Sequence, residues 1–302
     1  MQNIVLESAT GQGQLYIRIW EPEIPPKAVV HIVHGMAEHI DRYDRFAKFL
    51  NENAVLVIGA DNASHGKSIK DGGVRGYFGP ENGWDSLIKD MRAIHTEIKQ
   101  AYPDLPHFLF GHSMGSFLAR SYAARHGEDF DGFIFCGTAG KNPMLPIAKT
   151  IAKMEMRKKG LDTPSALLNN LSFGAYNNAF KPNRTLFDWL SRDEEEVDKY
   201  IADPACGFPF TAAGFRDLFF GLDEISSEAW AQKVPKKPIL LISGDADPVG
   251  TNGKGVQQVA QWLKKTGHNV NCILYPSARH ELLNEINRDA VYGDVLCFIE
   301  GA

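Results

Sequence analysis

The stretch from His107 to Gly127 constrains the fold more than any other part of the sequence. It begins with apolar and aromatic residues, as a short buried strand does, and from Met114 onward it carries apolar side chains at helical spacing. Between these parts stands Gly111-His112-Ser113-Met114-Gly115. A serine between two glycines at a strand-to-helix turn is what a nucleophile elbow requires. The stretch therefore predicts a strand, a tight turn that exposes Ser113, and a helix.

The same turn suggests a chemical role for Ser113. Side chains at Gly111 and Gly115 would collide with neighbouring backbone in so tight a turn. The first turn of the helix offers unpaired N–H groups and a positive dipole end, which suit an oxyanion. A Gly-rich βα turn with a helix-capping serine would carry the same residues. An acid, a histidine and a second oxyanion donor elsewhere in the chain decide between the two interpretations.

The composition is that of an ordinary globular protein, long enough for a large core. The chain has 302 residues, of which 44% are hydrophobic and 23% charged, and its formal net charge is −5. Because there is no long basic block, the sequence argues against nucleic acid as a main partner. Residues 1–20 do not resemble a secretory signal, and no run approaches the roughly 18 apolar residues of a membrane span. We therefore expect a cytoplasmic protein.

Apolar runs and amphipathic stretches alternate along most of the chain. Residues 4–9 and 14–20 predict an edge hairpin. Buried strands are expected at residues 28–34, 55–60, 107–110, 133–136 and 238–243, and a further strand at residues 270–275. Helices are expected at residues 41–53, 84–102, 114–127, 256–263 and 282–299. This alternation predicts an α/β fold with a mostly parallel, doubly wound central sheet and helices on both faces. Ligands bind such sheets at the carboxyl ends of the strands.

The alternation stops between residues 141 and 225. This segment contains helix-like pieces at residues 145–159, 191–201 and 212–222, separated by breaks with glycine and proline. We therefore expect a core domain of residues 1–140 and 226–302 and a helical cap insertion of residues 141–225. Frequent Met, Leu and Phe in the cap suit a pocket for an acyl or alkyl group, although most of these side chains must form the cap's own core. An apolar cap surface would also allow transient contact with a membrane surface.

Two strand-end loops after the cap supply candidates for the acid and the base. A serine hydroxyl is a weak nucleophile that needs a histidine to take its proton, and a buried carboxylate orients that histidine. Asp247 follows the strand at 238–243 and His280 follows the next strand, so both fall at the same sheet end as Ser113. Serine, acid, histidine is the chain order that goes with a nucleophile elbow in such a sheet. We predict a triad of Ser113, Asp247 and His280.

Both candidates have competitors. Asp245 directly follows its strand and is interpreted as a loop cap, whereas Asp247 reaches further toward His280. Glu281 and Glu285 belong to the loop and helix of His280 and are interpreted as structural. Four other histidines lie in strand-end loops, namely His34, His39, His65 and His112. Three of them precede the serine, which is the wrong order, and the fourth is its neighbour on a turn, where adjacent side chains point apart.

Attack on an ester creates an oxyanion, which backbone N–H groups stabilise. One donor is expected from Met114, the residue after the nucleophile. The other is expected from the loop after the first central strand, where His34, Gly35 and Met36 stand. We predict that the backbone N–H groups of Met36 and Met114 form the oxyanion hole.

The four cysteines are far apart and form no C-x-x-C pair; they are Cys136, Cys206, Cys272 and Cys297. Cys136 and Cys272 lie in strand-like runs and Cys297 in a helix-like one. Widely spaced cysteines of this kind are typical of small buried thiols in a reducing compartment rather than of a metal or redox site.

With these residues in place, the chain resembles the α/β-hydrolases of the monoacylglycerol lipase and lysophospholipase group, which is also classed with the S33 serine aminopeptidases. The resemblance covers nearly the whole chain and rests on HGMAEH (34–39), RGYFGPENGW (75–84), GHSMGS (111–116), GDADPVG (244–250) and RHELLNE (279–285). One loop departs from the family pattern D-x-R-G-H-G-x-S, because Ala63 and Ser64 replace the arginine and the glycine.

The resemblance implies a function. It assigns the triad and the oxyanion donors to the residues named above, gives the cap an acyl-binding pocket, and implies no cofactor and no metal. We therefore predict a serine ester hydrolase acting on monoacylglycerols, lysophospholipids or similar single-chain esters. One alternative is an aminopeptidase, which needs an acidic cluster such as Asp193–Glu196 to hold an amine. The other is a non-catalytic binding protein, which could dispense with a triad member.

Overall fold

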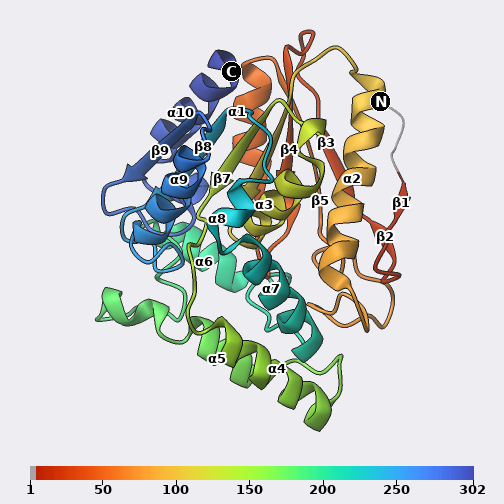
Figure 1. Cartoon of the computed structure of the whole chain (residues 1–302), viewed down its shortest axis with the longest axis vertical. Helices are drawn as coiled ribbons and strands as arrows, with labels where there is room; N and C mark the ends of the chain where they lie inside the picture. The colour runs from red at the N-terminus through yellow and green to blue at the C-terminus, as the bar shows by residue number, and fades with distance from the viewer. Residues whose placement is uncertain (1–4) are drawn as a thin grey trace.

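A computed structural model describes residues 5–302 and contains a central sheet of seven strands (Figure 1). The strands are β3 (Ile17–Trp20), β4 (Ala28–Val33), β5 (Val55–Ala60), β6 (His107–His112), β7 (Gly132–Cys136), β8 (Ile239–Gly244) and β9 (Val270–Tyr275). Their order across the sheet is β3-β5-β4-β6-β7-β8-β9. Only the edge strand β3 runs antiparallel to its neighbour, and the other pairs are parallel. The predicted mostly parallel sheet is confirmed.

Helices cover both faces of this sheet, as predicted. They are α1 (Asp44–Glu52), α2 (Gly83–Ala101), α3 (Met114–His126), α8 (Glu228–Ala231), α9 (Lys254–Lys265) and α10 (Arg288–Gly301). The apolar sides of α1 and α10 share one core, and those of α2, α3 and α9 share another. Because side chains alternate along a strand, β6 directs Phe108 and Phe110 to the first core and Leu109 to the second. A strand buried on both faces is apolar throughout for this reason.

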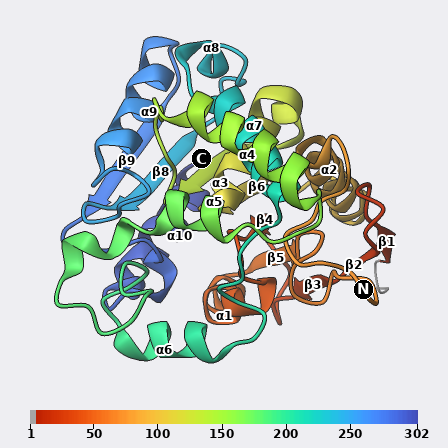
Figure 2. The same ribbon diagram turned by 90° about the horizontal axis from the view of Figure 1, so that it is seen from below.

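A run of helices separates β7 from β8. It consists of α4 (Leu145–Lys159), α5 (Ala166–Phe173), α6 (Glu194–Ala202) and α7 (Ala212–Ile225). Figures 1 and 2 show α4 and α5 together at one end of the molecule, beyond the sheet. Phe215 and Leu218 of α7 are buried in the same core as Trp84 of α2, so α7 joins this helical run to the rest of the fold. No helix within residues 5–302 is long and apolar enough to cross a membrane.

The N-terminal hairpin differs from the prediction. β1 (Leu6–Glu7) and β2 (Gln14–Leu15) form a separate two-stranded sheet, and only residues 17–20 join the central sheet. The predicted strand 14–20 is interrupted at Tyr16, whose N–H donates to Ser68 Oγ at 2.7 Å and whose carbonyl accepts from Asp61 at 2.9 Å. Residue 4 of the predicted first strand lies outside the described residues.

One helical prediction is wrong in part, and one helix was not predicted. The predicted helix 282–299 begins only at Arg288, after a 3₁₀ turn at Leu282–Asn284. The chain between them is held by the Glu285 carboxylate, which accepts from the backbone N–H groups of Arg192 and Arg279. The short helix α5 was not predicted, although Ser165 caps it by accepting from the N–H of Leu168.

Candidate active site

Ser113 stands at the turn between β6 and α3 in a strained conformation. Its φ is 53° and its ψ is −121°, and such angles cost a non-glycine residue about 1–3 kcal/mol. The flanking glycines allow the turn. A Cβ on Gly111 would lie 2.3 Å from the carbonyl oxygen of Gly115, and one on Gly115 would lie 2.0 Å from that of Val33. The close packing of backbone around Ser113 therefore holds it in this conformation.

Asp247 and His280 form a buried hydrogen-bonded pair. Oδ2 of Asp247 lies 2.9 Å from Nδ1 of His280, and the two residues are 0% and 2% exposed. Oδ1 of Asp247 accepts from the N–H of Val249 at 2.9 Å. The competing Asp245 instead accepts from the N–H of Ser277 at 2.6 Å. A carboxylate on Nδ1 leaves Nε2 of His280 as the nitrogen available to a serine.

Ser113 and His280 both lie against the end of β7. The N–H of Ser113 donates to the carbonyl of Cys136 at 3.0 Å. A Cβ on the next residue, Gly137, would lie 3.1 Å from Cε1 of His280. Within residues 5–302 the Ser113 hydroxyl forms no hydrogen bond to His280. Such a contact is often long without substrate and shortens when substrate binds.

The two predicted oxyanion donors lie in the loops next to Ser113. Met114 begins α3, and Met36 lies in the loop after β4. Neither backbone N–H has a hydrogen-bond acceptor in the part of the chain that the structure describes. The β4 loop passes close to the serine, because a Cβ on Gly35 would lie 3.1 Å from Cβ of Ser113. Two free N–H donors thus lie on segments that flank the Ser113 side chain.

Behind these loops lies a buried ion-pair network that the sequence analysis missed. Glu38 accepts from the N–H of Gly35 at 2.6 Å, from Nδ1 of His112 at 3.1 Å and from Nη1 of Arg42 at 2.6 Å. Arg42 also forms two 2.7 Å hydrogen bonds to Glu281, the residue after His280. The network therefore joins the β4 loop, the elbow and the histidine loop. Glu38 lies in a loop, so no helical spacing in the sequence marks its pairing with Arg42.

The charges in this network stabilise one another. Burial by itself would raise the pKa of Glu38, but the hydrogen bond from His112 and the charge of Arg42 outweigh it and hold that pKa well below its usual range. Burial would lower the pKa of His112, but the hydrogen bond and charge of Glu38 outweigh it and raise that pKa. The β4 loop therefore contributes a carboxylate, and the elbow contributes a histidine that stays protonated to higher pH than a free one.

The other strand-end histidines are occupied elsewhere. Nε2 of His34 accepts from the N–H of Asn62 at 2.8 Å. His39 pairs with Asp203. His65 is fully buried and packs on Phe78 at a ring separation of 6.0 Å, and burial lowers its pKa to about 3. None of these three is placed to replace His280 beside Asp247.

An aromatic cluster from the end of α5 and the segment between α5 and α6 lies against His280. The Trp189 ring is 5.1 Å from the imidazole, and the carbonyl of Trp189 accepts from the N–H of His280 at 3.4 Å. Tyr176 and Phe173 pack on Trp189 at ring separations of 5.0 and 6.4 Å. This part of the helical run therefore forms an apolar wall next to the histidine.

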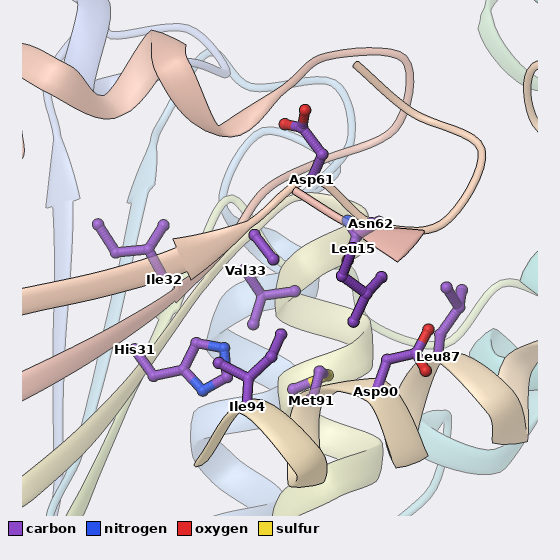
Figure 3. Close-up of a pocket in the computed structure, with 11 residues that line it drawn as sticks. Leu15, His31, Ile32, Val33, Asp61, Asn62, Leu87, Asp90, Met91 and Ile94 are labelled. Atoms are coloured by element: carbon purple, nitrogen blue, oxygen red, sulfur yellow. The ribbon is translucent and has the colours of Figure 1, made fainter. Parts of the chain in front are cut away.

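A separate cavity of about 10 Å³ lies between α2 and the sheet (Figure 3). It is lined by Leu15 of β2, His31 of β4 and Asp90 of α2, among other residues. This volume suits a single water molecule and is too small for an acyl chain. None of the five predicted site residues lines it.

Over nearly its whole length the chain is similar to known lipases and esterases. Residues 24–287 match the family described as serine aminopeptidase, S33. The chain is 28% identical over 301 residues to the monoacylglycerol lipase of Mycolicibacterium smegmatis, covering 97% of this chain and 95% of that protein. It is 28% identical over 284 residues to the monoglyceride lipase of Homo sapiens, covering 93% and 84%.

Solved structures show the same architecture. A highly thermostable carboxyl esterase from Bacillus coagulans, in complex with glycerol, matches with a TM-score of 0.94 and 33% identity, covering 99% of this chain and 98% of that one. A lipase in its open form matches with a TM-score of 0.90 and 28% identity, covering 99% and 98%. The fold is therefore the α/β-hydrolase fold that the sequence predicts. The chain belongs to the serine aminopeptidase S33 family of α/β-hydrolases, and within it is similar to monoacylglycerol lipases and carboxyl esterases.

Proposed function

We propose that the protein is a serine ester hydrolase with the triad Ser113, His280 and Asp247. His280 takes the proton of the Ser113 hydroxyl through Nε2, and the oxygen attacks the ester carbonyl. Asp247 holds the imidazole through Nδ1 and stabilises the imidazolium that forms. His280 then gives the proton to the leaving alcohol, and water hydrolyses the acyl-enzyme by the same steps.

The backbone N–H groups of Met36 and Met114 stabilise the oxyanion in this mechanism. Both donors are unpaired before reaction and lie on segments packed around Ser113. Because they are fixed in place before charge develops, they favour the transition state over the substrate. Losing one such donor costs on the order of 10²–10³ in rate.

The observation that carries the proposal is the buried 2.9 Å pair of Asp247 and His280 at the sheet edge where Ser113 stands strained. A capping serine in an ordinary βα turn would need neither the strain nor the pair. A non-catalytic binding protein would need neither of them either. A strained backbone and a buried charged pair both cost stability, so finding them together favours a functional role.

Single-chain esters are the proposed substrates, and residues 141–225 are proposed to form a cap that binds their acyl chain. The core domain is then residues 1–140 and 226–302. Phe173, Tyr176 and Trp189 give the cap an apolar wall beside His280. The M. smegmatis and human relatives carry the names of monoacylglycerol and monoglyceride lipases. Monoacylglycerols, lysophospholipids and similar esters combine one acyl chain, which suits the apolar wall, with one scissile carbonyl, which suits the single nucleophile.

The same cap is proposed to touch lipid surfaces transiently. Several of its large apolar side chains are exposed, including Met144, Ile147, Met154, Leu167 and Leu171. On α4 they alternate with exposed basic residues, Lys153, Arg157 and Lys158. An exposed apolar stripe beside basic side chains is typical of helices that lie on anionic membrane surfaces.

The aminopeptidase alternative is not favoured by the acidic cluster at the start of α6. Asp193 pairs with Arg288 at 2.8 Å and caps the helix, and Glu196 pairs with Arg45 at 3.2 Å and Lys199 at 2.8 Å. These carboxylates already have cationic partners, so they are poorly suited to hold the amine of a peptide substrate.

Ser113→Ala tests the proposal. The variant should lose turnover of p-nitrophenyl esters and labelling by a fluorophosphonate while keeping the wild-type melting temperature. Ser86→Ala, a change of a half-buried serine on α2, is the matched control and should retain both. Labelling that persists in Ser113→Ala would exclude this nucleophile. A panel of p-nitrophenyl esters, monoacylglycerols and aminoacyl anilides then separates the alternatives, and a preference for anilides would favour the peptidase.

A further inference from the structure

Outside the triad, three side chains with metal-binding chemistry come together. They are His39, at the end of the loop after β4, and Asp203 and Cys206, in the turn after α6. One donor atom from each lies within 4.8 Å of the others, and Nε2 of His39 is 2.8 Å from Oδ2 of Asp203. His39 is 164 positions from Asp203 in the sequence, so no spacing motif indicates this cluster.

The local backbone holds Asp203 and Cys206 on the same side of a tight turn. The N–H of Cys206 donates to the Asp203 carbonyl at 3.0 Å, and the N–H of Ala205 donates to Oδ1 of Asp203 at 2.7 Å. This leaves Oδ2 directed at His39. The His39 and Asp203 side chains are 15% and 32% exposed, so an ion can reach them from solvent.

We propose that His39, Asp203 and Cys206 form a Zn²⁺ site with water as the fourth ligand, at the junction of the β4 loop and the cap. Imidazole, carboxylate and thiolate are the three protein ligands that zinc prefers. At zinc–ligand distances of about 2.0–2.3 Å, tetrahedral ligand atoms lie about 3.3–3.7 Å apart. Nε2 of His39 and Oδ2 of Asp203 must therefore move apart from 2.8 Å, whereas the Cys206 sulfur already lies within 4.8 Å of both. The ion takes no part in ester hydrolysis, and the site is independent of the proposed function.

Proton balance follows from the ligands. Zinc binds cysteine as the thiolate, so the Cys206 thiol must lose its proton. Zinc binding forms the sulfur–zinc bond and releases that proton to solvent, so affinity should increase with pH.

The position of the site predicts what the ion does. The carbonyl of Ala37, next to Met36, already accepts from Tyr200 at 3.0 Å and from Gly207 at 2.9 Å, and both donors belong to the cap. An ion between His39 and Cys206 would add a coordinate link between the same two segments. Because it binds the folded arrangement only, it should raise the melting temperature.

Cobalt and zinc titrations test the site. Co²⁺ added to chelator-treated protein should give a thiolate-to-cobalt charge-transfer band that saturates at one equivalent and disappears when Zn²⁺ is added. Zn²⁺ should also raise the melting temperature. Cys206→Ser should abolish the band, and Asp203→Asn should weaken binding by more than about 100-fold, since loss of even an outer-shell partner costs 10–100-fold. Cys297→Ser, which changes the exposed cysteine of α10, should behave as wild type.

A wild-type protein without the band, or a band that survives in Cys206→Ser, would overturn the site. Ester turnover by Cys206→Ser separates the two proposals. It should equal that of wild type, because Cys206 is outside the triad, and loss of the metal site would leave the Ser113 result unchanged.

Discussion

At the scale of single residues, the acid of the proposed triad can be tested directly, because two candidate aspartates, Asp245 and Asp247, stand two positions apart. Asp247→Asn should reduce kcat for p-nitrophenyl esters by about 10³–10⁴, since an amide favours the wrong tautomer of His280. Asp245→Asn is the matched control. It should change kcat little, because Asp245 accepts only from the loop N–H of Ser277 among the described residues. A larger loss in Asp245→Asn would reverse the assignment.

Glu38 should matter for both stability and turnover. Glu38→Gln removes the carboxylate partner of His112 and one of the two carboxylate partners of Arg42, which keeps Glu281. Removing one partner of a buried pair costs about 3–5 kcal/mol, and the remaining Glu281 contact should place the loss near the lower end of this range. Because Glu38 holds the N–H of Gly35 and reaches the elbow through His112, kcat should fall more than KM rises. Denaturant unfolding and steady-state kinetics measure the two effects.

Lys67→Gln provides the comparison for that variant. Unlike the buried Glu38 network, its ion pair with Asp41 is largely exposed, so its loss should cost less than about 1 kcal/mol. Equal losses of stability in the two variants would show that the Glu38 network does not contribute as proposed.

Site residues that a local sequence pattern marks could be predicted. Site residues that only the fold brings together could not. Ser113 is marked by its two glycines, and Asp247 and His280 each follow a recognisable strand. Arg42 and Glu281 are 239 positions apart and lie next to each other only because β4 and β9 both end at the same sheet edge. No periodicity in a single sequence encodes such a pair.

At the scale of elements, α4 and α5 carry the proposed lipid contact. Combining Ile147→Gln, Met154→Gln and Leu171→Gln removes three exposed apolar side chains without opening the core. Binding to mixed phosphatidylcholine and phosphatidylglycerol vesicles should weaken by roughly 10- to 100-fold, as expected for a few kcal/mol of partly buried apolar surface. Vesicle flotation measures this loss.

Kinetics and a matched variant separate lipid contact from catalysis. The triple variant should hydrolyse soluble p-nitrophenyl butyrate at the wild-type rate and emulsified monoacylglycerol more slowly. Ile24→Gln combined with Ile286→Gln removes exposed apolar surface outside the cap and should bind vesicles normally. Equal weakening in both variants would contradict a cap-specific surface.

The elements differ in how far the sequence determined them. The buried strand 55–60 was predicted to the residue, because its continuous apolar run has clear ends. The partly exposed strand 270–275 was also predicted to the residue. The start of α10 was misplaced, because apolar spacing continues through residues 282–287 while Glu285 is held by side-chain contacts from Arg192. The α5 helix has only eight residues, which is too short for a periodic signal.

At the scale of the whole molecule, buried titratable groups set the pH dependence of stability. Burial lowers the pKa of His31 and His65 to about 3 and that of His95 to about 4. As pH falls below about 6.5, the unfolded state binds these protons and the folded state does not, so stability is lost. Burial raises the pKa of Asp90 and Asp217 to about 6, so between pH 6 and 4 the folded state takes up protons first and stability is gained. Burial also lowers the pKa of His34, His107 and His126. For His112 burial is outweighed by Glu38, which raises that pKa. The histidines with lowered pKa values outnumber the groups that oppose them, and stability should fall on acidification.

Two residues on the same small cavity allow the signs to be tested separately (Figure 3). His31→Leu removes a group that loses about 1.4 kcal/mol per pH unit on acidification, so its stability should fall less steeply than wild type between pH 6 and 4. Asp90→Asn removes a group that compensates in the same range, so its stability should fall more steeply. Urea unfolding at several pH values gives each slope. Because each slope is compared with wild type, any constant cost of the substitution cancels. If both slopes changed in the same direction, the prediction would be wrong. At least one of the two groups would then have a pKa shift opposite in sign to the one that its burial predicts.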